Sequence, residues 1–262
     1  MINATLLRGK WALVTGAGDG LGFAVADCLA EAGANVVLHD LDAQPEARDR
    51  IQARHAVQAL TVAADLRERP TIEAMMASLI ERCGGIDILV NNAVVRHFSP
   101  VEDFAPERWD EALAVNLSAP FHLTRLAVPG MKQRGWGRII NMASIYSTRG
   151  VENRIDYVTT KTAIVGLTRA VAVEMARTGV TCNALGPGTL PTPAIVARIA
   201  AIAAKENQSA EEATAAYLEE RQPSGRFVSL RSVGAAAVFL CSDAAADITG
   251  TMLPIDGGWS AI

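Results

Sequence analysis

TGAGDGLG, residues 15–22, is the stretch that decides the fold of this chain. It ends an apolar run at residues 10–15 and opens an amphipathic segment at residues 21–32. Glycines permit a tight turn here, and a helix that starts at the turn presents unpaired N–H groups to a pyrophosphate. The spacing G-x-G-x-x-G fails because Leu21 stands three residues after Gly18, whereas T-G-x-x-x-G-x-G fits. Such a loop can be a mere turn, but between a first strand and a first helix we interpret it as a nucleotide-binding loop.

The alternation of apolar runs and amphipathic segments continues along the whole chain. The runs are short and continuous, as in strands that are covered on both faces. Alternating strands and helices predict a doubly wound parallel sheet with helices on both faces. We therefore predict one α/β domain over residues 1–262, of Rossmann type, with a mostly parallel seven-stranded sheet. The apolar runs are residues 10–15, 35–40, 57–65, 86–92, 137–144, 180–188 and 252–256, and the main helical segments are residues 21–32, 70–83, 106–133, 155–178 and 230–242.

Composition and charge narrow the classes of function. Half of the 262 residues are hydrophobic and a fifth are charged, which is typical of a globular protein with one large domain. The net charge of -4 is mild and no basic stripe is present, so we expect neither nucleic acid nor a membrane surface as partner. We identify no signal peptide, no membrane-spanning run and no metal-ligand spacing among the four cysteines. We expect a cytoplasmic protein with reduced thiols and no bound metal.

Ligands of such sheets bind at the carboxyl ends of the strands, where this sequence places polar residues. Asp40 ends the second run, twenty residues after Gly20. A carboxylate there accepts hydrogen bonds from the adenine ribose hydroxyls and repels a 2′-phosphate, which favours NAD over NADP. Asp19 adds a second negative charge where a 2′-phosphate would need a basic residue. The alternative is that Asp40 only ends a strand.

Two further strand ends carry polar residues. Asp65 and Leu66 can bracket an adenine, and the asparagines of residues 91–93 can tie neighbouring loops through side-chain hydrogen bonds. Either group could be turn chemistry alone. Ser144 ends the fifth run, thirteen residues before Tyr157, so we expect its hydroxyl to face the same crevice.

Tyr157 and Lys161 stand four residues apart in a predicted helix, so their side chains meet on one face. A free phenol loses its proton only near about pH 10, and a nearby positive charge stabilises the phenolate. Such a pair could serve as an acid or a base near neutrality. Taken alone, the spacing favours the alternative of an aromatic side chain packed on a helix beside a solvated lysine.

Taken in order, these motifs resemble the short-chain dehydrogenase/reductase family over essentially the whole chain. The ordered set moves the interpretation of the Tyr157 and Lys161 pair toward catalysis. The set comprises T-G-x-x-x-G-x-G at residues 15–22, Asp40, Asp65, Leu66, Asn91, Asn92, Ala93, Asn116, Ser144, Tyr157, Lys161, Pro187, Gly188, Thr192, Asp256, Gly257 and Gly258.

The resemblance implies an NAD-dependent oxidoreductase that transfers a hydride between a secondary alcohol or ketone and the nicotinamide. Tyr157 would be the general acid/base, and Lys161 would lower its pKa and hydrogen-bond the nicotinamide ribose. Ser144 would hold the substrate oxygen. Asn116 would support a water chain that reaches Lys161.

The resemblance also implies the wider cofactor site and the assembly. Thr192 and the backbone at Leu190 would hold the carboxamide. A homo-oligomer, commonly a tetramer, is implied. The family often continues Asn-Asn-Ala with glycine, whereas Val94 follows here, so we expect a tighter loop. The expected cofactor-binding residues are Thr15, Gly16, Gly18, Asp19, Gly20, Leu21, Gly22, Asp40, Leu41, Asp65, Leu66, Asn92, Ala93, Tyr157, Lys161, Pro187, Gly188, Leu190 and Thr192.

The C-terminal tail resembles that of bacterial D-3-hydroxybutyrate dehydrogenases, a branch of the family that acts on a small hydroxy acid. In that branch a glutamine, a histidine and a lysine grip the carboxylate, at the positions of Arg96, Tyr146 and Arg154. The substitutions argue against hydroxybutyrate itself. Because arginine forks bind carboxylate, phosphate or sulfonate bidentately, we expect a small anionic hydroxy acid or a related acid. The expected substrate-binding residues are Arg96, Ser144, Tyr146, Arg154 and Tyr157.

Two other functions stay open. The arginines could be solvent-exposed or paired with Glu152 or Asp103, and the enzyme would then oxidise a neutral alcohol, a polyol or a sugar. The alternative from another class is a catalytically silent NAD-binding regulator. Such a regulator should have lost Tyr157, Lys161 or Ser144, and all three are present.

Residues 192–222 are rich in alanine and are predicted to be helical. By the resemblance, the segment at residues 189–222 covers the substrate as a mobile lid that excludes water. The alternative is that its apolar positions form a fixed packing face.

Overall fold

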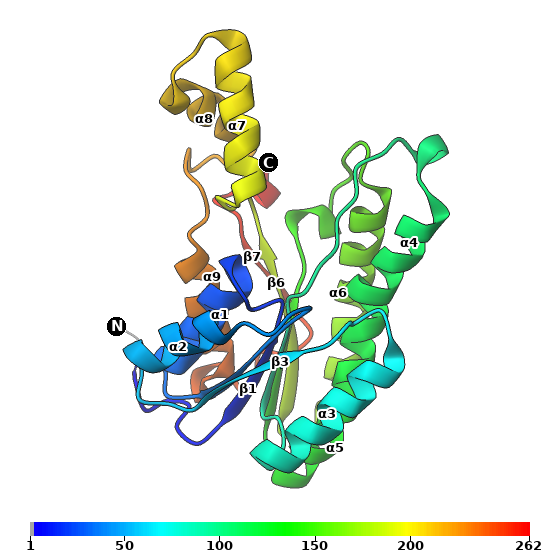
Figure 1. Ribbon diagram of the computed structural model, residues 1–262, viewed down its shortest axis with the longest axis vertical. Coiled ribbons are helices and arrows are strands. Elements are labelled where there is room, and N and C mark those ends of the chain that lie inside the picture. The colour runs from blue at the N-terminus through cyan, green and yellow to red at the C-terminus, as the bar shows by residue number, and fades with distance from the viewer. Residues whose placement is uncertain (1–2) are drawn as a thin grey trace.

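Seven strands form one sheet through the middle of the molecule in the computed structural model, which describes residues 3–262 (Figure 1). Every neighbouring pair is parallel, so the predicted doubly wound sheet is confirmed and is parallel throughout. The strands are β1 (Trp11–Thr15), β2 (Asn35–Asp40), β3 (Ala59–Ala63), β4 (Ile88–Asn91), β5 (Gly137–Met142), β6 (Val180–Pro187) and β7 (Met252–Ile255), in the spatial order β3-β2-β1-β4-β5-β6-β7. The connections reverse direction between β1 and β4, which creates a crevice at the carboxyl ends of these two strands.

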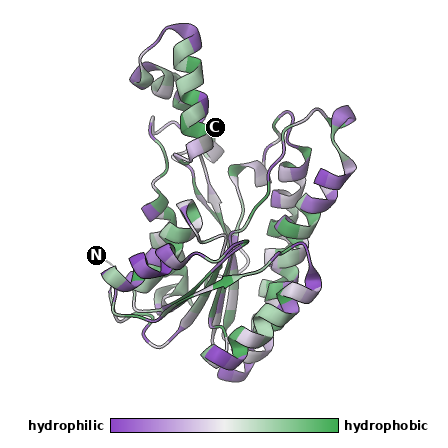
Figure 2. Ribbon diagram, viewed as in Figure 1, coloured by the Kyte–Doolittle hydropathy of each residue, from purple (hydrophilic) through white to green (hydrophobic). Residues whose placement is uncertain are grey.

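Helices cover both faces of the sheet, as predicted (Figure 1). The strands between them are largely apolar (Figure 2), and β1, β4, β5 and β6 are buried along their whole length. Each buried valine, leucine or isoleucine contributes about 1.5–3 kcal/mol, so the sheet is a firm base for the loops at its edge. One face carries α1 (Gly20–Glu31), α2 (Pro45–Arg54) and α9 (Leu230–Cys241), and the other carries α3 (Arg69–Cys83), α4 (Pro106–Leu113), α5 (Ala119–Arg134) and α6 (Ile155–Met175).

Some predicted segments differ from the structure. The helical segment predicted at residues 106–133 is confirmed, but it is not a regular α-helix throughout, because a π-helical turn at Ala114–Ser118 lies between α4 and α5. The helix α2 was absent from the predicted segments, since only Ala47 and Ile51 of it are buried and no apolar stripe marks it. The strands β3 and β4 are shorter than the predicted runs at residues 57–65 and 86–92.

The alanine-rich segment folds into two helices that project from the body of the molecule (yellow in Figure 1). These are α7 (Pro193–Glu206) and α8 (Ala210–Glu219). They pack against each other around a small cluster of their own, formed by Ile199, Ala203 and Ala213. The segment is therefore a separate layer above the carboxyl end of the sheet.

Within residues 3–262, no helix combines the length and the apolar character that crossing a membrane requires. In that same part of the chain, no group of three or more His, Cys, Asp or Glu side chains is placed to bind a metal ion. The four cysteines are free thiols, and Cys28, Cys182 and Cys241 are buried.

Candidate active site

The glycine-rich loop is fastened to the loop that follows β4. Thr15 Oγ1 accepts hydrogen bonds from the backbone N–H groups of Asn92 (2.9 Å) and Ala93 (3.0 Å). The side-chain amide of Asn92 donates to the carbonyl oxygens of Thr15 (2.8 Å) and Gly16 (3.0 Å). These bonds hold the two strand ends together on either side of the crevice.

Gly16 and Gly22 make the close approach inside this loop feasible. Gly16 has a φ of +62°, and a Cβ on Gly22 would lie 2.0 Å from the carbonyl oxygen of Gly16. Gly20 also has a positive φ, of +60°, but the space beside it is open. An open glycine turn at the N-terminus of α1 has the shape and the free N–H groups that a pyrophosphate requires. The loop therefore fits a dinucleotide.

Asp40 joins the end of β2 to the same loop. Its Oδ2 accepts a hydrogen bond from the N–H of Gly18 at 3.0 Å, and its Oδ1 accepts one from the N–H of Leu41 at 2.9 Å. Leu41 is 62% exposed, and the side chain of Asp19 is exposed with one oxygen 4.0 Å from a guanidinium nitrogen of Arg50. The structure thus gathers the predicted acidic groups at one rim of the loop.

The side chains of Asp65 and Leu66 lie in different environments. Arg67 grips the Asp65 carboxylate through its Nε at 2.9 Å and a terminal nitrogen at 2.6 Å, and this hydrogen-bonded pair lowers the pKa of Asp65. Arg67 also lies 3.4 Å from Glu111. Leu66 is buried in the core on the α3 side of the sheet. The carboxylate of Asp65 is therefore engaged by the protein, and Leu66 is a packing residue of this edge.

Tyr157 and Lys161 lie one turn apart on α6, as their spacing predicts. Lys161 Nζ is 5.8 Å from the centroid of the Tyr157 ring. The ammonium group is buried and donates a hydrogen bond to the carbonyl oxygen of Met142 at the end of β5. Burial, with a smaller contribution from the positive charge of Arg96, lowers the pKa of Lys161 from 10.5 to about 7. The solvated lysine of the alternative interpretation is wrong.

Ser144 lies at the end of β5 and begins a short 3-10 turn, Ile145–Ser147. Its Oγ accepts a hydrogen bond from the N–H of Tyr146 at 3.2 Å. Ser147 Oγ accepts from the N–H of Ser144 at 3.2 Å and donates to the carbonyl oxygen of Lys161 at 2.6 Å. This chain of bonds fixes the Ser144 turn against α6 beside the Tyr157 and Lys161 pair.

Asn116 lies in the π-helical turn between α4 and α5, and it is buried. Its Oδ1 accepts from the N–H of Val95 at 2.9 Å, and its Nδ2 donates to the carbonyl oxygen of Val95 at 3.0 Å and to Thr160 Oγ1 at 3.3 Å. The extra residue of a π turn redirects a side chain, and here it aims the amide at two elements of the site. Asn116 ties the loop after β4 to α6, next to Lys161.

The loop after β6 carries the predicted Pro187, Gly188, Leu190 and Thr192, and it rests on a residue that sequence reasoning missed. Gln222 is fully buried; its Oε1 accepts from the N–H of Thr189 and its Nε2 donates to the carbonyl oxygen of Arg226. A Cβ on Gly188 would lie 2.7 Å from Gln222 Oε1, so only glycine fits. No sequence signal marks Gln222, because glutamine is common on surfaces.

Arg154 stands at the start of α6 with its guanidinium over two aromatic rings. Its Cζ lies 4.5 Å from the ring centroid of Tyr157 and 4.2 Å from that of Phe98. The Nε is buried without a hydrogen-bond partner, and the pKa is lowered by burial. Within residues 3–262, Arg154 and Arg96 form no ion pair, so the alternative pairing with Glu152 or Asp103 is absent there. Arg96 is exposed, as the other half of that alternative expects, whereas Arg154 is partly buried.

Tyr146 and Trp259 form an aromatic wall beside Tyr157. The ring of Tyr146 is 6.3 Å from that of Tyr157 and 5.7 Å from that of Trp259, both edge to face. Burial raises the pKa of Tyr146. Asp256 holds the turn that carries Trp259, since its two oxygens accept from the N–H groups of Gly258 (3.0 Å) and Ser260 (2.8 Å). From the sequence, Asp256 was identified only as part of the family motif set, and Trp259 was not identified as a site residue.

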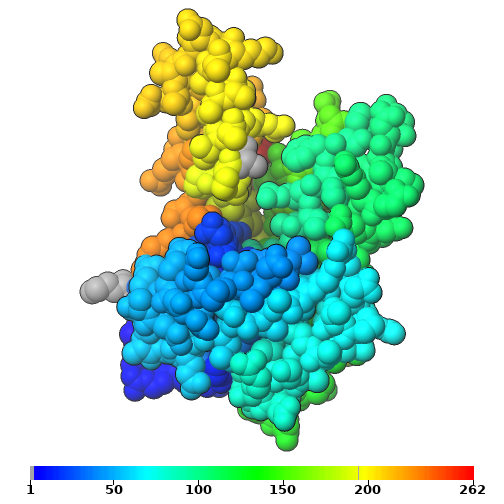
Figure 3. All heavy atoms as spheres, viewed as in Figure 1, coloured from blue at the N-terminus to red at the C-terminus, as the bar shows by residue number. Residues whose placement is uncertain are grey.

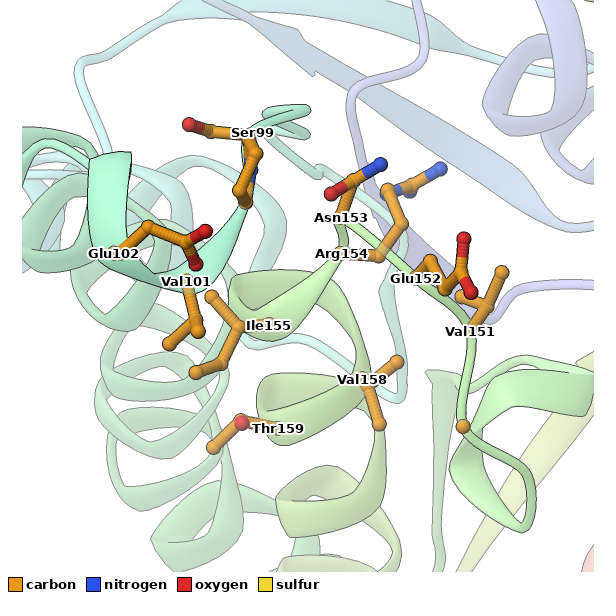
Figure 4. A pocket seen from close by; sticks show the side chains of 12 residues that line it. Ser99, Val101, Glu102, Val151, Glu152, Asn153, Arg154, Ile155, Val158 and Thr159 are labelled. Carbon is orange, nitrogen blue, oxygen red and sulfur yellow. The ribbon is translucent and has the colours of Figure 1, made fainter.

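An open groove lies between α7 and the green segment that carries α4 and α6 (Figure 3). A pocket of about 490 Å³ opens nearby, and Arg154 lines it, but neither Ser144 nor Tyr157 does. In Figure 4, Val101 points toward Ile155 of α6 across this pocket. Arg154 therefore both lines this pocket and lies over the ring of Tyr157.

The chain is similar to known proteins in both sequence and structure. A family model described as Enoyl-(Acyl carrier protein) reductase matches residues 16–260. The chain is 44% identical to a D-beta-hydroxybutyrate dehydrogenase of Cupriavidus necator, covering 98% of this chain and 100% of the relative. It is 41% identical to a second one, from Rhizobium meliloti, over 96% of this chain and 99% of the relative. The crystal structure of L-sorbose reductase from Gluconobacter frateurii, complexed with NADPH and L-sorbose, has a TM-score of 0.93, 29% identity and 99% coverage of both chains.

Proposed function

Because the chain belongs to the short-chain dehydrogenase/reductase family, we propose that it is an NAD-dependent dehydrogenase of a small anionic hydroxy acid. The chain is an oxidoreductase of the alcohol dehydrogenase type, with hydroxy acid dehydrogenases among its relatives. The observation that carries the anionic substrate is Arg154, whose half-buried guanidinium lies over Tyr157 with a buried Nε that has no partner. An anion held there stands beside the proton-transfer group.

The proposed chemistry divides between the cofactor and the protein. When bound, the nicotinamide supplies hydride exchange, while the protein orients the reactants and moves the proton. Tyr157 transfers the proton of the substrate oxygen, and Ser144 Oγ holds that oxygen by a hydrogen bond. Lys161 supplies a cation close to the ring of Tyr157, and Asn116 fixes the loop after β4 against α6.

The cofactor is a nicotinamide dinucleotide, and we assign NAD on electrostatic grounds. The carboxylate of Asp40 is fixed at the loop by the N–H of Gly18, and Asp19 adds a charge of the same sign that Arg50, 4.0 Å away, partly offsets. A 2′-phosphate placed at this rim meets repulsion, whereas free ribose hydroxyls can donate to Asp40. The bound NADPH of the Gluconobacter reductase belongs to that protein, so a direct comparison of NAD with NADP is required.

The domain and assembly proposals follow the family resemblance. The segment at residues 189–222 acts as the substrate lid, which its projection above the groove supports (Figure 1). A cytoplasmic homotetramer is the assembly we propose. Val173 on α6 and Phe121 on α5 are exposed apolar side chains that an interface on the long helices would cover.

A neutral substrate is the second candidate, and the likeness to an L-sorbose reductase favours it. The third, a silent NAD-binding regulator, loses support because Ser144, Tyr157 and Lys161 are all present and Lys161 lies 5.8 Å from the ring centroid of Tyr157. The test is NADH formation by purified protein with NAD and paired substrates: small hydroxy acids or sulfonates, and neutral alcohols of matching size. Turnover confined to the anions, and abolished in Tyr157→Phe, supports the proposal. Turnover of the neutral partners instead would assign the protein to polyol or sugar oxidation.

A further inference from the structure

Phe98 places two arginines from different elements at one exposed ring. The ring is 55% exposed, and the Cζ atoms of Arg154 and Arg198 lie 4.2 Å and 5.7 Å from its centroid. Arg154 belongs to the start of α6, whereas Arg198 belongs to α7 in the proposed lid. Guanidinium groups stack on aromatic faces while their N–H edges stay free for an anion. Phe98 therefore presents one arginine from the body and one from the lid at the same place.

A third arginine is close to the same place. Arg96 lies two residues before Phe98, and its charge lowers the pKa of both Lys161 and Arg154. Among residues 3–262, none of these three arginines is paired with a carboxylate.

Two of the carboxylates near the arginines contact other groups. Asp156 has no exposed surface and accepts a hydrogen bond from the N–H of His97 at 3.1 Å. Glu111 lies 3.2 Å from the ring nitrogen of His97 and 3.4 Å from Arg67. Glu102 and Glu152 line the same pocket as Arg154, but in the described part of the chain neither forms an ion pair with it, so the arginines keep N–H groups for an anion.

We propose that Arg198 joins Arg96 and Arg154 in binding a substrate head group with three terminal oxygens, a sulfonate or a phosphonate, in preference to a carboxylate. This inference rests on the proposed function and specifies its substrate. A planar carboxylate has two oxygens, which one arginine fork can occupy. Arginines carried by three different elements, the loop after β4, the start of α6 and α7, suit a tetrahedral group, whose oxygens point in three directions. Binding would also draw α7 toward the body.

The test uses substrates that share the frame CH3–CHOH–CH2–X and differ only in X. The carboxylate and the sulfonate carry one charge each, so a preference between them reports shape, while the phosphonate adds charge and the carboxamide is the neutral reference. We expect kcat/KM for the sulfonate or the phosphonate to exceed that for the carboxylate by roughly tenfold or more. Arg198→Ala should raise KM for the preferred substrate about tenfold and change KM for the carboxylate by less than about twofold.

Two variants control for charge and for lid folding. Lys205→Ala removes a positive charge from the same helix about 10 Å further along and should leave all KM values unchanged. Arg198→Lys keeps the positive charge but lacks the guanidinium fork. Relative to Arg198→Ala, it should lower KM for the phosphonate more than KM for the sulfonate. Preference for the carboxylate, or an equal effect of Arg198→Ala on every substrate including the carboxamide, would overturn the inference while leaving the proposed function in place.

Ligand binding without turnover separates the two proposals. If no member of the series is oxidised in a Tyr157-dependent manner, the proposed function fails. In that case, the rise in Tm of the NADH complex is compared between propane-1-sulfonate and butyrate. This comparison tests the head-group preference without turnover. A larger rise with the sulfonate, lost in Arg198→Ala, supports the inference, and an equal rise with both anions overturns it.

Discussion

The guanidinium of Arg154 lies over the ring of Tyr157, with 4.5 Å between its Cζ and the ring centroid. Arg154 directly precedes α6 and Tyr157 stands three positions after it, so the first turn of the helix brings them together. Lys161, one turn further on, lies 5.8 Å from the same ring. In the proposed enzyme, recognition of the anion and transfer of the proton therefore share one helical turn.

Arg154→Met should change both steady-state constants. We expect KM for an anionic substrate to rise about tenfold or more, because a charge-assisted bond to the anion is lost. We expect kcat to fall as well, because the cation over Tyr157 disappears. Kinetics with an anionic substrate and a neutral one of equal size measure the difference, and Arg169→Met on the exposed face of α6 is the control. An unchanged KM for the anion would contradict the proposed role.

The buried Lys161 should make stability depend on pH. Its pKa is lowered from 10.5 to about 7 by burial, so the unfolded chain binds more protons at this site between these values. The free energy of unfolding therefore rises with pH across that window, and the cost of the buried charge is fully present below about pH 7. Lys161→Met removes this titration. Urea unfolding without cofactor, at about pH 6.5 and about pH 9.5, should show wild type gaining stability relative to the variant; a constant difference would count against it.

Asp40→Ser should shift the cofactor preference toward NADP. The substitution removes the carboxylate that repels a 2′-phosphate and leaves the N–H of Gly18 without its present acceptor. We expect the ratio of kcat/KM for NAD to that for NADP to fall by roughly tenfold or more. Asp42→Ser, two residues further along and exposed, is the matched control. If both variants alter the ratio equally, only the net charge matters.

Gly22→Ala should disrupt the glycine-rich loop. The new Cβ would lie 2.0 Å from the carbonyl oxygen of Gly16, so the start of α1 must move, at a cost of about 1–3 kcal/mol. Affinity for NADH, followed by its fluorescence, should fall in parallel with Tm. Gly166→Ala is the contrasting variant, because nothing lies near its Cβ position on α6, and it should be neutral or stabilising by up to about 1 kcal/mol.

The sheet could be predicted from sequence because its strands are buried on both faces. Continuous apolar runs such as β1 and β6 have few alternative structures, and the turn at residues 15–22 fixes where the first helix begins. Helix α2 could not be predicted in the same way, since two buried residues leave no periodic signal. The π-helical turn was also invisible, because its residues keep helical spacing and only the hydrogen-bonding register changes.

The part of the site that could be predicted is formed by residues close together in the sequence. Tyr157 and Lys161 are neighbours because both are on α6, and the helix alone brings them together. Gln222, Trp259 and Phe98 reach the site through tertiary contacts between distant segments. Local sequence around these residues contains no trace of such contacts, so the proposed partners of Arg198 became visible only in the folded chain.

The two projecting helices have a small apolar cluster of their own, around Ile199, Ala203 and Ala213, separate from the cores that flank the sheet. In the proposed enzyme, mutations on the groove side of α7 should therefore alter substrate choice at little cost to the folding of the rest. In the proposed enzyme, the α7–α8 cassette is the part of the chain that can be exchanged with the sheet and its flanking cores left intact. A laboratory chimaera that grafts this cassette between family members is the corresponding route to new substrate range.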